Sequence, residues 1–201
     1  MIKASWIFLF VLSVLASGAV NTYGQTEDGW KAENLQTIPP RPVNYEASPA
    51  YPFGHLNPDA PSETKQLSFL IGEFDCEDRI YSPQNNKWYR MDTVRKAEYV
   101  LDGYAIQDKN WTALSSTSNI RAFDPKTKQW HITYFKTLPY SSGVWKGGKE
   151  GENMVFRQAE GKTTSRLTFF DIGEDRYSWK AENVTDGKAV MNWIFTCKRR
   201  R

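Results

Sequence analysis

Histidine and cysteine are scarce in this sequence, whose 201 residues contain two of each. His55 and His131 lie far apart along the chain, and neither stands among other ligand residues at metal-binding spacing. The sequence has no G-x-S-x-G nucleophile motif, and its glycine-rich stretch at 143–151 lacks the strand–loop–helix context of a phosphate loop. We therefore expect no metal, no cofactor and no covalent catalysis.

The charge balance gives no indication of nucleic-acid binding. Lys and Arg number 26 against 23 Asp and Glu, but five of the basic residues are Lys3 and the run 198–201. Without those five, 21 basic residues face 23 acidic ones, whereas a nucleic-acid binder carries a basic stripe on its folded face. We expect 199–201 to be a basic, solvated tail, with contact to an anionic surface as the alternative.

Apolar runs long enough to span a membrane are also missing. The run at 6–16 has 11 residues, whereas a spanning helix needs roughly 20. Lys3 precedes it and small residues follow it, which is typical of an export signal. We predict a signal peptide at 1–24, cleaved after Gly24 (Gly18 is the alternative), and a secreted or periplasmic protein without a membrane span.

Proline is concentrated in one segment. Residues 25–61 hold seven of the ten prolines and show neither a helical nor a strand period. We interpret this segment as an extended arm or linker. Its aromatic residues indicate that parts of it pack on the folded domain or on a partner; they are Trp30, Tyr45, Tyr51 and Phe53.

A folded domain is predicted over 62–198. Ser62 is a candidate N-cap for a short helix over 62–71 that ends at Gly72. From there on, strand-like runs recur about every ten to twelve residues, separated by turn signals such as Asp102-Gly103 and Asp186-Gly187. The pattern predicts an all-β fold, an up-and-down antiparallel meander of about ten strands closed into a barrel, with one N-terminal capping helix.

Alternation within the runs places aromatic residues on shared faces. Three faces are predicted: Trp130, Ile132 and Tyr134; Tyr177, Trp179 and Ala181; Met191, Trp193, Phe195 and Cys197. Barrels of this size can hold one small ligand inside.

Cys76 and Cys197 fall in the first and last predicted strands, which are neighbours in a closed meander. Export permits a disulfide, so we expect one that fastens the seam of the barrel. Asn110-Trp111-Thr112 and Asn183-Val184-Thr185 match the glycosylation sequence, which matters only in a host that glycosylates.

The segment LSFLIGEFDCEDRI at 67–80 resembles the opening of calycin-like barrels, such as lipocalins and nitrobindin-like proteins. It is most similar to an uncharacterised bacterial domain family with an FLxGxW-type start, and YVLDGYAIQD at 99–108 matches its later turn. Phe74 stands in place of the usual tryptophan, and Lys198 or Arg199 is expected to cover its ring. The resemblance implies binding of a small apolar molecule. The haem-ligating histidine of nitrobindin-like proteins has no counterpart, because no histidine follows His131.

Interior aromatic residues and mid-strand arginines are the best candidates for a ligand site. An inward arginine can hold a carboxylate or phosphate group. The predicted ligand-binding residues are Trp130, Tyr134, Trp145, Trp179, Trp193, Arg121 and Arg166. We expect Asp75, Glu77 and Asp78 to lie on a solvated outer face, and His131 to be exposed or simply hydrogen-bonded.

Three functions stay open on the sequence. The first is non-covalent binding of a small apolar or amphipathic ligand. The second is a barrel enzyme, an isomerase or hydrolase using Tyr134, His131 or an interior carboxylate. The third is a protein-interaction module with a solid barrel, which would recruit its partner through the arm and the basic tail. The oligomeric state is not predicted.

Overall fold

The computed structural model describes residues 31, 35 and 37–201, and the predicted signal peptide 1–24 lies outside them. The chain divides into two units, Met1–Arg41 and Pro42–Arg201. The described residues of the first unit form no helix or strand. Within the described part of the chain, no helix is both long and apolar enough to cross a membrane.

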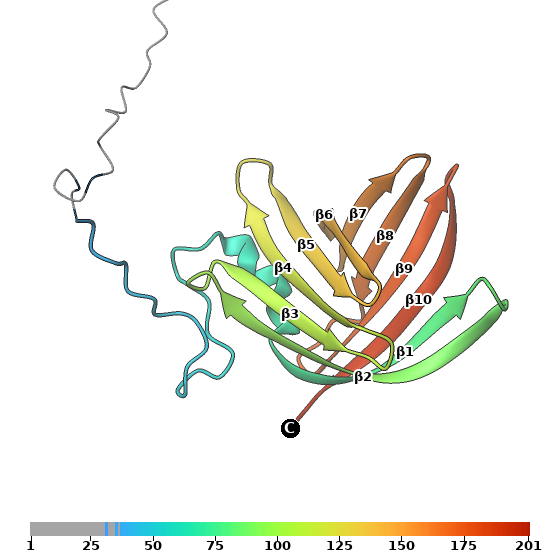
Figure 1. The fold of residues 1–201 in the computed structure, drawn as a ribbon, viewed down its shortest axis with the longest axis horizontal. Coiled ribbons are helices and arrows are strands. Elements are labelled where there is room, and N and C mark those ends of the chain that lie inside the picture. The colour runs from blue at the N-terminus through green and yellow to red at the C-terminus, as the bar shows by residue number, and fades with distance from the viewer. Residues whose placement is uncertain (1–30, 32–34, 36) are drawn as a thin grey trace, which may run out of the picture. The chain divides into compact units, whose positions relative to one another are not determined.

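The second unit is an all-β closed barrel of ten antiparallel strands preceded by one short helix, as predicted (Figure 1). Each strand pairs with its neighbours in sequence, and the last pairs with the first. The elements are the 3-10 helix η2 (Ser62–Leu70) and the strands β1 (Gly72–Ser82), β2 (Lys87–Val100), β3 (Ala105–Trp111), β4 (Ser116–Asp124), β5 (Gln129–Thr137), β6 (Tyr140–Glu150), β7 (Asn153–Glu160), β8 (Thr163–Phe170), β9 (Arg176–Thr185) and β10 (Lys188–Arg199).

The helix η2 supplies the floor of the barrel. Its Leu67 and Leu70 are buried in the core with Phe74 of β1. The predicted N-cap is wrong: Pro61 occupies the cap position, and the Ser62 hydroxyl bonds to the Glu63 carboxylate. The last backbone hydrogen bond of this 3-10 helix runs from the Ile71 N–H to the Ser68 carbonyl, three residues earlier. The chain then turns directly into β1.

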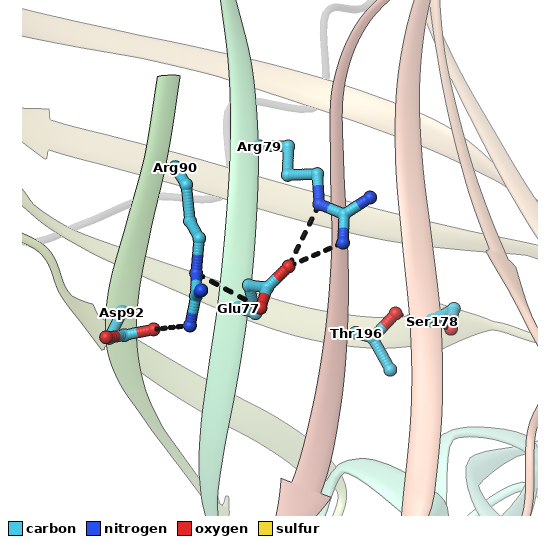
Figure 2. Close-up of polar contacts among 6 residues, drawn as sticks. All are labelled: Glu77, Arg79, Arg90, Asp92, Ser178 and Thr196. Atoms are coloured by element: carbon cyan, nitrogen blue, oxygen red, sulfur yellow. Dashed lines mark hydrogen bonds and ion pairs between the residues drawn. The ribbon is translucent and has the colours of Figure 1, made fainter. Parts of the chain in front are cut away.

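The seam between β1 and β10 is closed covalently. Cys76 and Cys197 are directly opposite each other in the ladder and form the predicted disulfide. Both are buried on the inner side of the sheet. On the outer side the seam is polar, and the hydroxyls of Thr196 in β10 and Ser178 in β9 lie 3.2 Å apart (Figure 2).

Two carboxylates face each other across β1 and β2 on this outer side. Glu77 is paired in register with Asp92, an arrangement that is unfavourable for like charges. Arg90 reaches both of them, at 3.1 Å from Glu77 and 3.4 Å from Asp92 (Figure 2). Arg79 donates two further hydrogen bonds to Glu77 and, with Arg90, holds the pKa of that carboxyl below its usual value.

The end of β10 contacts the start of β1. The Arg199 guanidinium lies 4.6 Å from the centre of the Phe74 ring, as expected, and Nη1 donates to the Ile71 carbonyl at 2.6 Å. Arg200 forms an ion pair with Asp75 at 2.6 Å. Arg199 and Arg200 are therefore held by the barrel, which corrects the expectation of a solvated tail at these two positions.

The C-terminal half of the proline-rich segment packs on the turn between β2 and β3. The N–H of Tyr99 donates to the Phe53 carbonyl at 2.9 Å, and Asn57 binds the carbonyls of Asp102 and Gly103. Asn57 is 2% exposed. Residues 42–61 thus belong to the same unit as the barrel.

Replacing both Cys76 and Cys197 by serine is expected to lower the free energy of unfolding. The bond joins residues 121 apart in sequence, for which chain entropy predicts a stabilisation of about 5 kcal/mol, and measured values are often smaller. Denaturant unfolding of both proteins, with and without reductant, measures the difference. Reductant should change only the parent protein; an equal response of both would contradict the disulfide account.

Gly72→Ala is expected to destabilise the barrel. Gly72 has φ +120°, and an added Cβ would lie 2.4 Å from Arg199 Nη1. The backbone strain costs roughly 1–3 kcal/mol, and the clash moves Arg199 from the Phe74 ring. Gly148→Ala is the matched control, because a Cβ there meets nothing within 4 Å. Equal unfolding midpoints for the two variants would contradict the prediction.

Candidate functional site

The barrel interior contains a cavity of about 260 Å³. Leu70 of η2 lies at its floor, and residues from β2, β3, β4, β5, β6, β8, β9 and β10 form its walls. The lining residues include Arg95, Asp108, Asn119, Arg121, Tyr134, Trp145, Phe169, Tyr177, Trp179, Asn192, Trp193 and Phe195. Seven of the 22 lining residues are aromatic and five are charged, so the wall combines large flat rings with a few charged groups.

The strands β9 and β10 form an aromatic wall. The rings of Trp179 and Phe195 are stacked, with centroids 4.8 Å apart and planes 14° apart. Trp193 meets Trp179 edge to face at 5.6 Å. Such flat, rigid side chains offer a large contact area at a small cost in conformational entropy, so this wall suits a planar ligand.

A bulge in β10 sets the position of Trp193. The register with β9 shifts between Met191 and Trp193, and both Asn192 and Trp193 line the cavity as a result. Met191 is 38% exposed. The expectation that Met191 shares a face with Trp193 is wrong, because simple alternation does not hold across a bulge.

The first interior ion pair joins β1 and β2. Asp78 has no exposed surface, and its carboxylate accepts two hydrogen bonds from Arg95 Nη2, at 2.9 and 3.2 Å. The indole N–H of Trp193 lies 3.4 Å from the same carboxylate. The expectation of a solvated outer face is thus wrong for Asp78. It stands two residues from Cys76 in β1, so it shares the inner face, whereas Glu77 faces outward.

The second interior ion pair joins β3 and β4. Arg121 Nε donates to one carboxylate oxygen of Asp108 at 2.5 Å, and the Asn119 amide donates to the other at 2.7 Å. All three side chains are buried. A buried ion pair is stable only when both partners are present and further hydrogen bonds satisfy them; here Asn119 supplies that bond to the carboxylate.

Each interior arginine has one buried nitrogen that donates to no acceptor among the described residues. These atoms are Arg95 Nε and Arg121 Nη1, in side chains that are 8% and 6% exposed as whole residues. The Arg95 guanidinium lies 3.7 Å from the centre of the Phe195 ring, so it is stacked on the aromatic wall. A buried donor without a partner is costly and calls for an explanation.

The interior phenols are poor proton acceptors. Burial raises the pKa of Tyr177 far above its usual value, and it raises the pKa of Tyr134 as well. Both therefore keep their protons at neutral pH. The carboxylate of Asp108 is occupied by Arg121 and Asn119, so the cavity presents hydrogen-bond donors more readily than it presents a general base.

Five of the seven predicted ligand residues lie together around the cavity, namely Arg121, Tyr134, Trp145, Trp179 and Trp193. Trp130 is fully buried in the core below, where its indole N–H donates to Gln66 of η2 at 3.1 Å. Arg166 faces the opposite side of β8 and pairs with Glu182 at 2.9 Å. Burial tends to raise the pKa of Glu182, but bonds from Lys180 and Arg166 leave it lowered.

His131 faces away from Trp130 and Ile132 and is half-buried, so it does not line the cavity. No cluster of three or more potential metal ligands occurs among the described residues. The two glycosylation-sequence asparagines, Asn110 and Asn183, line the cavity. Asn110 is buried, so attachment of a glycan there would require the barrel to open, whereas Asn183 is exposed.

Sequence reasoning missed three interior residues: Asp78, Arg95 and Asp108. The inward position of Asp78 could have been predicted from that of Cys76, because residues two apart in a strand share a face. Asp108 and Arg95 lie in strands whose inward face the sequence left undetermined.

No protein-family model matches the sequence, and no curated protein is similar to it. Three solved structures are similar to part of this chain. The S-type phycobiliprotein lyase CPES of Guillardia theta gives a TM-score of 0.46 at 10% identity, over 68% of this chain and 92% of that one. Rv2717c of M. tuberculosis gives 0.48 at 12%, over 71% and 100%. A protein of unknown function from the DUF3598 family of Nostoc punctiforme gives 0.39 at 10%, over 66% and 48%.

The topology agrees with the calycin-like resemblance: a short helix enters the first strand of a closed up-and-down barrel, and Arg199 covers Phe74. Membership of the bacterial family with an FLxGxW-type start stays a prediction.

Asp108→Asn is expected to lower the free energy of unfolding more than a carboxylate-to-amide substitution on the surface does. Removal of one partner from a buried ion pair costs about 3–5 kcal/mol, because the other charge is left unpaired. Replacing both members by apolar residues, as in Asp108→Leu/Arg121→Met, should cost less than the single change. Denaturant unfolding measures all three proteins.

The matched control is Glu150→Gln, which breaks the exposed pair with Arg157. Exposed pairs contribute about 0–1 kcal/mol. If Asp108→Asn proved no more harmful than Glu150→Gln, the interior pair would have to be solvated instead of buried.

Proposed function

We propose that this chain binds a small, mostly apolar or amphipathic molecule inside its barrel without covalent chemistry. The observation that carries the proposal is the cavity of about 260 Å³ with its aromatic wall. Tyr134, Trp145, Trp179 and Trp193 would contact the apolar body of the ligand, and Arg121 its polar end.

The size of the cavity limits the ligand. An engineered apolar cavity of about 150 Å³ takes up benzene, and drug-sized ligands occupy pockets of roughly 300–1,000 Å³. At about 260 Å³, this cavity suits a molecule of two or three fused or linked rings, or an aliphatic molecule of similar volume.

Export is part of the proposal. The features of residues 1–24 are typical of a signal peptide, and a formed disulfide suits an oxidising compartment. The ligand would then be met in the periplasm or outside the cell.

The two alternatives have less support. A solid interaction module would have no room inside the barrel, whereas here the interior is partly open. An isomerase or hydrolase would need a free acid or base beside the ligand. The Asp78 and Asp108 carboxylates are bonded to arginines, and the raised pKa values of Tyr134 and Tyr177 keep the phenols protonated. Binding without chemistry is therefore the function we favour.

The fluorescent, uncharged probe N-phenyl-1-naphthylamine tests the proposal. We expect saturable binding to the parent protein with a blue shift of the probe emission, because the aromatic wall excludes water from it. Trp179→Ala should weaken binding at least tenfold, since it removes a stacked ring from the wall.

Trp88→Ala is the matched control. Trp88 lies in β2, is 47% exposed and does not line the cavity, so its loss should leave binding unchanged. Native mass spectrometry of the protein from an oxidising host, compared with the denatured mass, would reveal a co-purified ligand. Absence of probe binding, or equal weakening by both substitutions, would refute an interior site.

A further inference from the structure

We infer that the ligand carries an uncharged hydrogen-bond acceptor, such as a ketone, aldehyde, ester or amide carbonyl, which the interior arginines receive. This inference rests on the proposed function and names the chemical class of its ligand. The sequence alone favoured a carboxylate or phosphate, because it showed the arginines without their partners.

The buried donors without partners belong to two arginines that line the cavity from different walls. Arg121 of β4 donates a hydrogen bond from Nε to Asp108, while its Nη1 has no acceptor among the described residues. Arg95 of β2 donates a hydrogen bond from Nη2 to Asp78, and its Nε likewise has no acceptor among the described residues. Both residues line the cavity and are more than nine-tenths buried. An acceptor in the ligand would satisfy donors that have no partner in the protein.

The charges of the interior are already balanced. Arg95 and Arg121 are each matched by one aspartate, at 2.9 Å and 2.5 Å. Two more charged residues contribute to the lining, and their charged groups are also paired, Lys96 with Glu98 and Glu182 with Arg166 and Lys180.

An anionic ligand would therefore find no uncompensated positive charge. It would lose its hydration and meet two nearby carboxylates, Asp78 and Asp108, and both effects disfavour its binding in a buried site. A neutral carbonyl accepts the same hydrogen bonds without adding a charge. The pairing of each arginine with an aspartate thus turns an anion site into a site for neutral acceptors.

The positions of the arginines also define the shape of the ligand. Arg95 is stacked on Phe195, which is stacked on Trp179, and Arg121 lies 5.5 Å from the Phe169 ring. The Arg95 guanidinium therefore covers a face of Phe195, and the Arg121 guanidinium lies beside Phe169. A ligand that places an aromatic body against the wall and a carbonyl oxygen near these guanidinium groups combines both contacts, so an aryl carbonyl compound fits best.

Three probes of matched size test the inference by displacement of N-phenyl-1-naphthylamine. They are 2-acetylnaphthalene, with a neutral acceptor, 2-ethylnaphthalene, with none, and 2-naphthoate, with a negative charge. We expect 2-acetylnaphthalene to bind the parent protein at least tenfold more tightly than 2-naphthoate at neutral pH.

The variant Asp108→Leu/Arg121→Met locates the effect, since it removes the pair without leaving a lone buried charge. It should lower the affinity ratio of 2-acetylnaphthalene to 2-ethylnaphthalene at least tenfold. The control Glu150→Leu/Arg157→Met makes the same exchange on the outer face and should leave the ratio unchanged. Near-ultraviolet circular dichroism confirms that both variants are folded.

Each outcome decides a different point. Equal or tighter binding of 2-naphthoate would overturn the inference in favour of an anion site. If the affinity ratio of 2-acetylnaphthalene to 2-ethylnaphthalene were the same in the parent and in Asp108→Leu/Arg121→Met, the inference would be overturned. The cavity would then select its ligand by apolar contacts alone, and the proposed function would stand. If the fluorescent probe and all three naphthalenes fail to bind the parent protein, the proposed function itself fails, and the inference with it.

Discussion

Closure of the β1–β10 seam is the constraint on which the rest of this structure depends. Closure gives every strand a partner on both sides and creates an inside and an outside. The disulfide between Cys76 and Cys197 stands in the middle of that seam, with the Arg199–Phe74 contact at one end. The same alternation that points Cys76 inward points Asp78 inward, so the seam also determines which charge enters the interior.

The interior combines two kinds of surface that are rarely compatible. Aromatic rings of β9 and β10 exclude water, while two aspartate–arginine pairs bring four charges into the same space. The charges are tolerated because each is paired with an opposite charge on the adjacent strand. The pairs leave a few N–H groups without protein acceptors, and under the proposed function these groups would distinguish one ligand from another.

Much of this architecture could be predicted from the sequence, because turn residues and period-two alternation are local signals. All ten strands and the Cys76–Cys197 pairing were found in this way. The interior pairs were not found, because Asp78 and Arg95 are 17 residues apart and become partners only through the β1–β2 register. The bulge after Met191 likewise depends on how β10 fits against β9, which no local pattern records.

The position of the disulfide has a consequence for a protein that meets proteases. Eight of the ten strands lie wholly between Cys76 and Cys197, as do the larger parts of β1 and β10 and every turn of the barrel. A single cut in any of those turns would yield two fragments that stay covalently joined and paired along their ladders. The barrel can thus be cut once in a turn without coming apart.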